Sequence, residues 1–206
     1  MALLSALLSC LLVLPFQPVF TAERIPPQVE ARMRGSSYPE EGTPEIRLED
    51  LRYLRLSYYD FNGVPQTGEM VCNAAIAQDL LEIFRSLYEA QYPIRSIRLV
   101  DDFGGSDDAS MLADNTSCFN FRPVPGQRHL SRHALGMAVD VNPYENPYLD
   151  RAGVIRPPEA AAYADRSRDF PHKIDRQDLC CRLFLAHGFT WGGSWAHSKD
   201  WQHFQK

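Results

Sequence analysis

Several sequence motifs that identify common hydrolases are missing from this chain. There is no His-Glu-x-x-His stretch, which excludes the usual layout of zinc proteases. There is no Gly-x-Ser-x-Gly turn, and no cysteine has a convincing histidine partner, so a serine or cysteine hydrolase is disfavoured. None of the five cysteines forms a Cys-x-x-Cys pair, which argues against a zinc-ribbon site.

The chain also has fewer basic than acidic residues, 21 Lys and Arg against 26 Asp and Glu. The net charge is −5 and the isoelectric point is about 5.7, whereas nucleic-acid binders usually present a basic surface. We therefore expect no nucleic-acid partner. The chain has no internal repeat and no low-complexity tract. At 206 residues, with 45% hydrophobic residues, it is long enough for one domain with a proper core.

The first 22 residues carry no charge and include a leucine-rich run from Ala2 to Leu14. This run is too short to span a membrane, and its length is typical of a signal-peptide core. We therefore predict a signal peptide at residues 1–22 and export to the periplasm or the outside of the cell. Leu7–Cys10 loosely resembles a lipoprotein processing site, which makes Cys10 a candidate lipid anchor. An N-terminal helix in a cytosolic protein is the alternative.

The rest of the chain divides into a lead-in and a domain. Residues 23–50 are rich in Pro, Glu and Arg and weakly patterned, so we interpret them as a linker. Residues 51–206 are then the functional domain. Within them, apolar spacing predicts a long helix over 73–92 and a shorter one over 178–187. Residues 142–168 are rich in Pro and Tyr without periodicity, which predicts a long loop over the site.

Two further features have more than one interpretation. Cys72 and Cys118 could pair in an exported protein, although nothing in the sequence requires it. The adjacent Cys180 and Cys181 would form a strained bond and are better interpreted as thiols. Segment 101–114 is acidic but lacks the regular ligand spacing of a calcium loop, so we expect a solvated loop there.

Two short clusters, the stretch Ser131–Asp140 and a counterpart near the C-terminus, carry the residue types of a catalytic zinc site. Together they supply two imidazoles and two carboxylates. Zinc binds nitrogen and oxygen ligands, and a hydrolytic site keeps one position open for water. We therefore predict that zinc is bound by His133, Asp140 and His203, with Asp200 as the carboxylate that handles protons.

Residue spacing sets a condition on this prediction. Residues 137–141 are predicted as a short strand that carries Asp140, and Gly136 breaks any helix that leads into it. Asp200 and His203 are three residues apart, so a regular strand would point them to opposite faces. If both line the site, the chain must bend between them.

The order Ser-x-His, Gly-x-Ala-x-Asp and Asp-x-x-His-Phe resembles the zinc D-alanyl-D-alanine carboxypeptidase family. That family also contains D-alanyl-D-alanine dipeptidases and L-alanyl-D-glutamate endopeptidases. The resemblance covers roughly residues 65–206 and extends to three further motifs, Asn115–Arg122, Asp140–Pro143 and Trp191–Trp195. The chain departs from part of the family by having Asp rather than Glu at position 200.

The resemblance implies both a fold and an activity. The fold would be α+β, with a small antiparallel sheet and flanking helices, like the hedgehog/DD-peptidase fold. The activity would be zinc-dependent hydrolysis of peptidoglycan stem peptides that contain D-amino acids, of the D,D-carboxypeptidase or L,D-endopeptidase type. Zinc lowers the pKa of its bound water, and Asp200 would take the proton and deliver it to the leaving amine. We expect a monomer that acts on these wall peptides.

The resemblance also implies contacts with the substrate. Arg122 is the best match to a family arginine upstream of the first histidine. It would pair with a substrate carboxylate or stabilise the developing oxyanion, and a structural salt bridge is the alternative. We predict Gln127, Ser131 and Trp195 as further substrate-binding residues. His197 is a rival ligand, although a bystander role is the simpler interpretation.

Two other functions stay open at this point. One is a non-catalytic module of the same fold that keeps zinc and binds wall peptides or a partner protein. The presence of Asp200 favours catalysis, because a pure binder needs no spare carboxylate. The other is a serine or cysteine hydrolase, which sensitivity to a chelator would distinguish from a metal enzyme.

Overall fold

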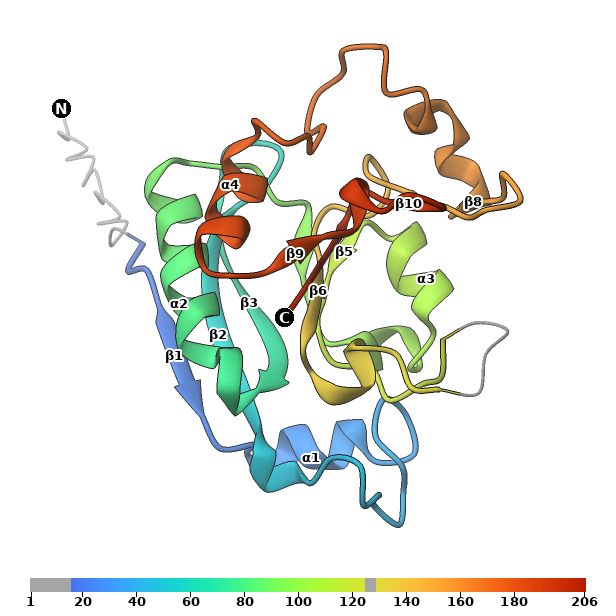
Figure 1. The fold of residues 1–206 in the computed structure, drawn as a ribbon. Helices are drawn as coiled ribbons and strands as arrows, with labels where there is room; N and C mark the ends of the chain where they lie inside the picture. Colours follow the sequence, from blue (N-terminus) through green and yellow to red (C-terminus); the bar gives the residue numbers. More distant parts are fainter. Residues whose placement is uncertain (1–15, 125–128) are drawn as a thin grey trace, which may run out of the picture.

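The computed structural model describes residues 16–124 and 129–206, and its N-terminal half is built on a three-stranded antiparallel sheet (Figure 1). The sheet contains β1 (Phe20–Glu23), β2 (Leu51–Tyr59) and β3 (Pro65–Asn73), with β2 in the middle. The turn between β2 and β3 includes the expected Asn62-Gly63 pair. Asp60 Oδ1 accepts hydrogen bonds from the backbone of Asn62 and Val64, and Gly63 has a φ of +72°.

Both faces of this sheet are covered, because residues alternate between the two sides of a strand. On β2, Leu54 and Leu56 belong to the core under α2 (Ala74–Glu89). Leu51 and Tyr53 face the other way, into a second core with α1 (Pro27–Met33). The sheet therefore lies between two hydrophobic cores and serves as the scaffold for both.

The long helix predicted over 73–92 is confirmed as α2. Asn73 caps it, since its side chain accepts a hydrogen bond from the backbone N–H of Ala75. The predicted apolar stripe is its buried face, which includes Leu80, Phe84 and Leu87. The shorter predicted helix is α4 (Leu179–Ala186), which packs against α2 through Phe84 and Phe184.

The segment interpreted as a linker, residues 23–50, contains α1 and a 3-10 helix, η1 (Leu48–Asp50). Val29, Met33 and Tyr38 are buried in the second core beside Tyr53. Residues 20–22, which the sequence pattern placed in the signal peptide, pair with β2 as part of β1. Residues 1–15, and with them the candidate lipid-anchor Cys10, lie outside the described residues.

The acidic segment 101–114 does not form the solvated loop that its composition suggested. It contains a 3-10 helix and a short α-helix that follow β4 and precede β5, a parallel pair of two-residue strands. Their bounds are β4 (Ser96–Ile97), η2 (Val100–Phe103), α3 (Asp107–Leu112) and β5 (Asn115–Thr116). Only Ser96 and Ile97 of the apolar stretch 94–100 form a strand, because a strand exists only where a neighbouring strand offers hydrogen bonds.

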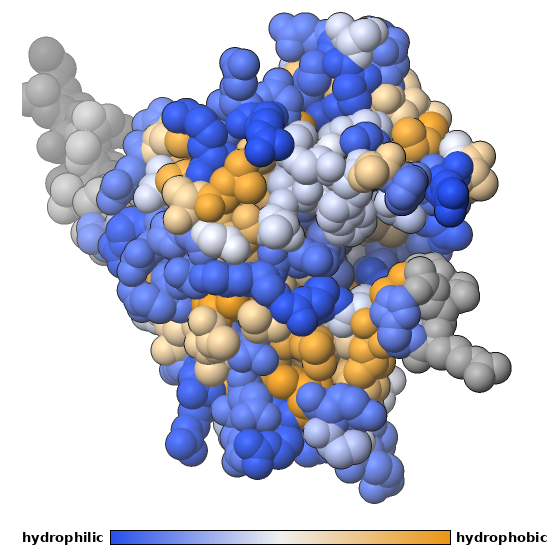
Figure 2. All heavy atoms as spheres, viewed as in Figure 1, coloured by the Kyte–Doolittle hydropathy of each residue, from blue (hydrophilic) through white to orange (hydrophobic). Residues whose placement is uncertain are grey.

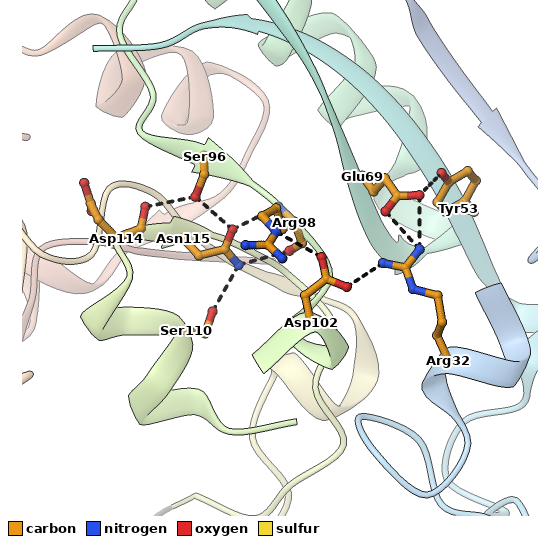
Figure 3. Close-up of polar contacts among 9 residues, drawn as sticks. All are labelled: Arg32, Tyr53, Glu69, Ser96, Arg98, Asp102, Ser110, Asp114 and Asn115. Atoms are coloured by element: carbon orange, nitrogen blue, oxygen red, sulfur yellow. Dashed lines mark hydrogen bonds and ion pairs between the residues drawn. The ribbon is translucent and has the colours of Figure 1, made fainter. Parts of the chain in front are cut away.

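A polar network holds this segment to the sheet (Figure 3). Arg32 on α1 donates to Glu69 on β3 and to Asp102 in η2, and Asp102 also accepts from Arg98. The amide of Asn115 bonds both the N–H and the C=O of Arg98. These bonds satisfy the backbone polar groups of Arg98 and hold η2 to α1 and β3.

The C-terminal half adds a second three-stranded antiparallel sheet, in the order β6-β11-β9. Phe204 on β11 stacks on Phe184 of α4 with ring centroids 4.3 Å apart, so this sheet shares the core of α2 and α4. The elements of this part are η3 (His133–Leu135), β6 (Ala138–Asp140), β9 (Thr190–Trp191), η5 (Gly192–Ser194) and β11 (His203–Gln205).

A third small sheet has the order β10-β7-β8, and it lies beside α3 in Figure 1. Its members are β10 (Lys199–Asp200), β7 (Tyr148–Leu149) and β8 (Ile155–Arg156), followed by η4 (Pro158–Ala164). The predicted loop 142–168 thus contains three short regular elements joined by turns. Arg166 ties it together by donating to the carbonyls of Glu145, Tyr163 and Ile174, and burial lowers the pKa of this guanidinium to about 10.

The predicted α+β class, with small antiparallel sheets and flanking helices, is confirmed. Cys72, Cys118, Cys180 and Cys181 are buried free thiols. No helix among the described residues is long and apolar enough to cross a membrane. Hydrophilic side chains cover most of the face drawn in Figure 2, with hydrophobic ones in smaller patches between them.

Replacing Phe184 by Ala should destabilise the domain strongly, because this ring joins α4, β11 and α2 in a fully buried position. We expect the free energy of unfolding in urea to fall by about 3–5 kcal/mol. The control is Leu112→Ala at an exposed position of α3, which should change it by no more than about 0.5 kcal/mol. Equal effects of the two substitutions would contradict this account of the core.

Candidate metal centre

Strand pairing brings the first two candidate ligands together. β6 and β11 are antiparallel, and Asp140 is directly opposite His203 in their register. Directly opposed residues of an antiparallel pair project from the same face of the sheet. His203 Nδ1 lies 2.9 Å from Asp140 Oδ1, so the pairing alone places an imidazole against a carboxylate.

His133 reaches the same point from a tight turn. It opens the 3-10 helix η3, which ends at Gly136 with a φ of +64°, as the expected helix break requires. A Cβ at position 136 would lie 2.6 Å from the backbone nitrogen of Asn73, so only glycine fits between this turn and β3. His133 Nε2 is thereby held 3.2 Å from Asp140 Oδ2 and 3.1 Å from His203 Nδ1.

The outward-facing nitrogen of each imidazole is fixed by a hydrogen bond. His133 Nδ1 lies 2.6 Å from the carbonyl oxygen of Cys118, and His203 Nε2 lies 3.0 Å from the side-chain oxygen of Gln205. Both partners are acceptors, so each ring places its N–H there. The two inward nitrogens then present lone pairs to each other, an arrangement that is repulsive until a cation stands between them.

The pKa shifts of Asp140 and His203 also indicate that the cluster is stabilised by a positive charge. Burial alone would raise the pKa of Asp140, but the neighbouring His133 and His203 lower it far below its usual range. Burial would lower the pKa of His203, but the hydrogen bond and charge of Asp140 raise it to about 9. In the absence of a metal ion, a proton on His203 therefore takes the place of the cation.

The three residues fit zinc. Their ligand atoms all lie within 4.8 Å of one another, and all three side chains are buried. Tetrahedral bonds of about 2.0–2.1 Å require ligand atoms about 3.3 Å apart, close to the spacing found here. Two nitrogens and one carboxylate oxygen, each oriented by a further hydrogen bond or strand pairing, leave a fourth position for water.

Asp200 stands beside this cluster because the chain changes sheets. It ends β10, the chain bends at Trp201 and Gln202, and His203 begins β11. Because Asp200 and His203 are three residues apart, both can line the site only if the chain bends between them, as it does here. Asp200 Oδ2 lies 4.0 Å from His203 Nδ1, while Oδ1 is buried and has no hydrogen-bond partner among the described residues. Burial raises the pKa of Asp200, and the charge of Asp140 adds to this, so that it reaches about 7 despite the opposing histidines.

The cluster opens into a cleft of about 550 Å³. Arg122, Ser131 and Trp195 line it, as does Asp200. Arg122 is also ion-paired with Asp107 at the start of α3. The two interpretations of Arg122 from the sequence, a place in the cleft and a structural salt bridge, are therefore compatible.

The other predicted contacts differ in their placement. Ser131 Oγ accepts a hydrogen bond from the backbone of Ala134, which supports the turn that carries His133. The ring of Trp195 is 5.4 Å from that of His203 and forms a wall of the cleft. His197 is exposed and does not join the metal cluster, and Gln127 lies outside the described residues.

Sequence patterns missed several residues of the site. Gln205 and the carbonyl of Cys118 orient the imidazoles, and Tyr148 and Arg156 line the cleft. The alternation of His203 and Gln205 on one strand face could have indicated the first of these. The others depend on pairings between short, distant strands, for which the sequence carries no local signal.

These features define a class: a small α+β domain with a candidate metal site of two histidines and one carboxylate, and a spare carboxylate next to it. Residues 125–206 match the family model described as D-alanyl-D-alanine carboxypeptidase. Over these residues the chain is similar to that family. The match covers less than half of the chain but includes the candidate metal ligands and Asp200. No curated protein and no solved structure matches the chain.

Gln205 should matter for metal affinity because its side-chain oxygen fixes the tautomer of His203. We expect Gln205→Leu to weaken zinc binding by about tenfold to a hundredfold, measured by competition with a chromophoric chelator. Gln205→Glu retains an acceptor at this position and should bind zinc at least as tightly as the parent. Equal affinities of the parent and Gln205→Leu would show that His203 is oriented by its strand alone.

Proposed function

We propose that this protein is a zinc-dependent peptidase that hydrolyses peptide bonds in peptidoglycan stem peptides containing D-amino acids. The observation that carries the proposal is the convergence of His133, Asp140 and His203 beside the unpartnered carboxylate oxygen of Asp200. The match of residues 125–206 to the family model described as D-alanyl-D-alanine carboxypeptidase supports the substrate class. The site residues fit both a D,D-carboxypeptidase and an L,D-endopeptidase.

The proposed chemistry divides between the metal and Asp200. Zinc, when bound, supplies Lewis acidity and lowers the pKa of water at the open position. Asp200 Oδ1 accepts the proton of the attacking water and then gives it to the nitrogen of the departing amine. Its lack of a hydrogen-bond partner suits this task, because no existing bond must be broken for it to receive the proton.

The walls of the cleft would hold the peptide. Arg122 stands at its edge, oriented by Asp107, and would help to hold a substrate carboxylate or the oxyanion. Trp195 would pack against the peptide beside His203. We propose Ser131 and Gln127 as further contacts.

We also propose that the protein acts outside the cytoplasm, where wall peptides occur. The uncharged N-terminal segment supports export, either as a cleaved signal peptide or through lipidation at Cys10. A monomer would suffice, because the chain itself supplies every residue of the proposed site.

Incubation of the purified protein with defined muropeptides tests the proposal directly. We expect mass analysis to show fragments produced by cleavage at a bond next to a D-residue. A chelator should abolish cleavage, and added zinc should restore it. Cleavage that persists after complete metal removal, or binding of wall peptides without cleavage by zinc-loaded protein, would overturn the assignment.

Asp200→Ala separates catalysis from metal binding. We expect kcat to fall by at least about a hundredfold, because a proton-transfer group is lost. Zinc content, measured by atomic emission, should stay near one ion per chain, since the three proposed ligands remain. The matched control Asp150→Ala, at another carboxylate on the cleft wall, should keep most of its activity. An unchanged rate for Asp200→Ala would exclude it as the proton carrier.

A further inference from the structure

The small sheet β10-β7-β8 presents a row of three side chains to the cleft. Asp200 on β10 is directly opposite Tyr148 on β7, and Tyr148 is directly opposite Arg156 on β8. Directly opposed residues of antiparallel strands project from the same face. All three line the cleft, so the row leads from the metal centre to Arg156.

The reverse face of this sheet confirms the direction of the row. Leu149, next to Tyr148 in sequence, packs against the main hydrophobic core. Because successive residues of a strand point to opposite sides, Tyr148 is directed away from that core and into the cleft. The position of Arg156 is thus set by strand register and core packing, and does not depend on a loop conformation.

Arg156 differs from the other two arginines of the cleft. Arg122 is ion-paired with Asp107, and Arg132 donates to the carbonyl oxygen of Lys206. Arg156 has a single ion-pair partner among the described residues, Asp108, at 3.8 Å. Both of these side chains are substantially exposed, at 42% and 76%, so the pair contributes little and yields readily to a ligand.

We propose that Arg156 forms a carboxylate-binding subsite of the cleft, which recognises a free carboxylate of the peptide substrate on the side of the cleft formed by β8. The proposal rests on the peptidase function proposed above and adds a determinant of its substrate specificity. A guanidinium pairs with a carboxylate in a planar, two-bond arrangement, which makes Arg the residue suited to this recognition. Asp108 faces it across the cleft and competes until the substrate arrives.

The geometry also limits where that carboxylate lies in the substrate. Neighbouring strands are about 4.8 Å apart, so the backbone at Arg156 stands about 10 Å from the backbone at Asp200. An extended peptide advances about 3.3 Å per residue. The recognised carboxylate is therefore within about three residues of the cleaved bond, as the C-terminal carboxylate or as an acidic side chain.

The test compares matched peptides and Arg156→Met. Each peptide ends in D-alanyl-D-alanine; one pair differs in a C-terminal carboxylate or carboxamide, and the other in Glu or Gln three residues before the end. For the parent protein we expect the carboxylate member of one pair to be favoured about tenfold in kcat/KM. Arg156→Met should lose that preference, so that it cleaves the two members of the pair with similar kcat/KM. The pair that loses its preference identifies the source of the carboxylate.

Arg151→Met is the matched control, because Arg151 is an exposed arginine in the turn of the same hairpin and does not line the cleft. It removes the same charge and should keep the preference. Calorimetric binding of the same peptides to zinc-free protein provides a readout that needs no hydrolysis. A binding preference lost only in Arg156→Met would support the subsite, even if no peptide were cleaved. Absence of cleavage would count against the peptidase function and not against the subsite. A preference that survives Arg156→Met in both measurements would overturn the subsite.

Discussion

The pairing of β6 with β11 is the constraint on which the site depends. Its register sets Asp140 opposite His203, and Val139 and Phe204 on the same two strands point into the core. Because Phe204 is buried against Phe184, the preceding residue His203 is held in a fixed position relative to the core. Because a slip of one residue would turn every side chain to the other face, the hydrophobic core protects the geometry of the metal centre.

The polar cluster depends on this packing because burying its side chains together costs free energy. Two imidazoles whose inward nitrogens face each other, and two carboxylates close by, are buried together. Burying charged groups costs free energy unless opposite charge compensates them. Packing of the folded core supplies the free energy to assemble the cluster, and a cation bound at the candidate site would supply the compensating charge. The affinity for a metal ion is in this sense a product of the packing around it.

How much could be predicted from the sequence depends on whether the signal is local. The apolar stripe of α2 and the break at Gly136 are local signals, and the structure contains both. The buried role of Val29 and Met33 escaped prediction because α1 has only seven residues, too few to show a period. The two-residue strands β7, β8 and β10 exist only through pairing with each other, so neither the order of residues 142–168 nor the place of Arg156 could be predicted.

The division of the C-terminal region into separate small sheets has a functional consequence. Asp200 belongs to the sheet of β7 and β8, whereas His203, three residues later, belongs to the sheet of β6 and β9. The proposed proton carrier is thus attached to the wall of the cleft, whereas the candidate metal ligands Asp140 and His203 lie on strands that pack on the core. A change in the segment 142–168 can alter the distance between Asp200 and the metal centre without disturbing the ligands themselves. In the proposed function, β10 would therefore couple substrate selection by this wall to the alignment of Asp200.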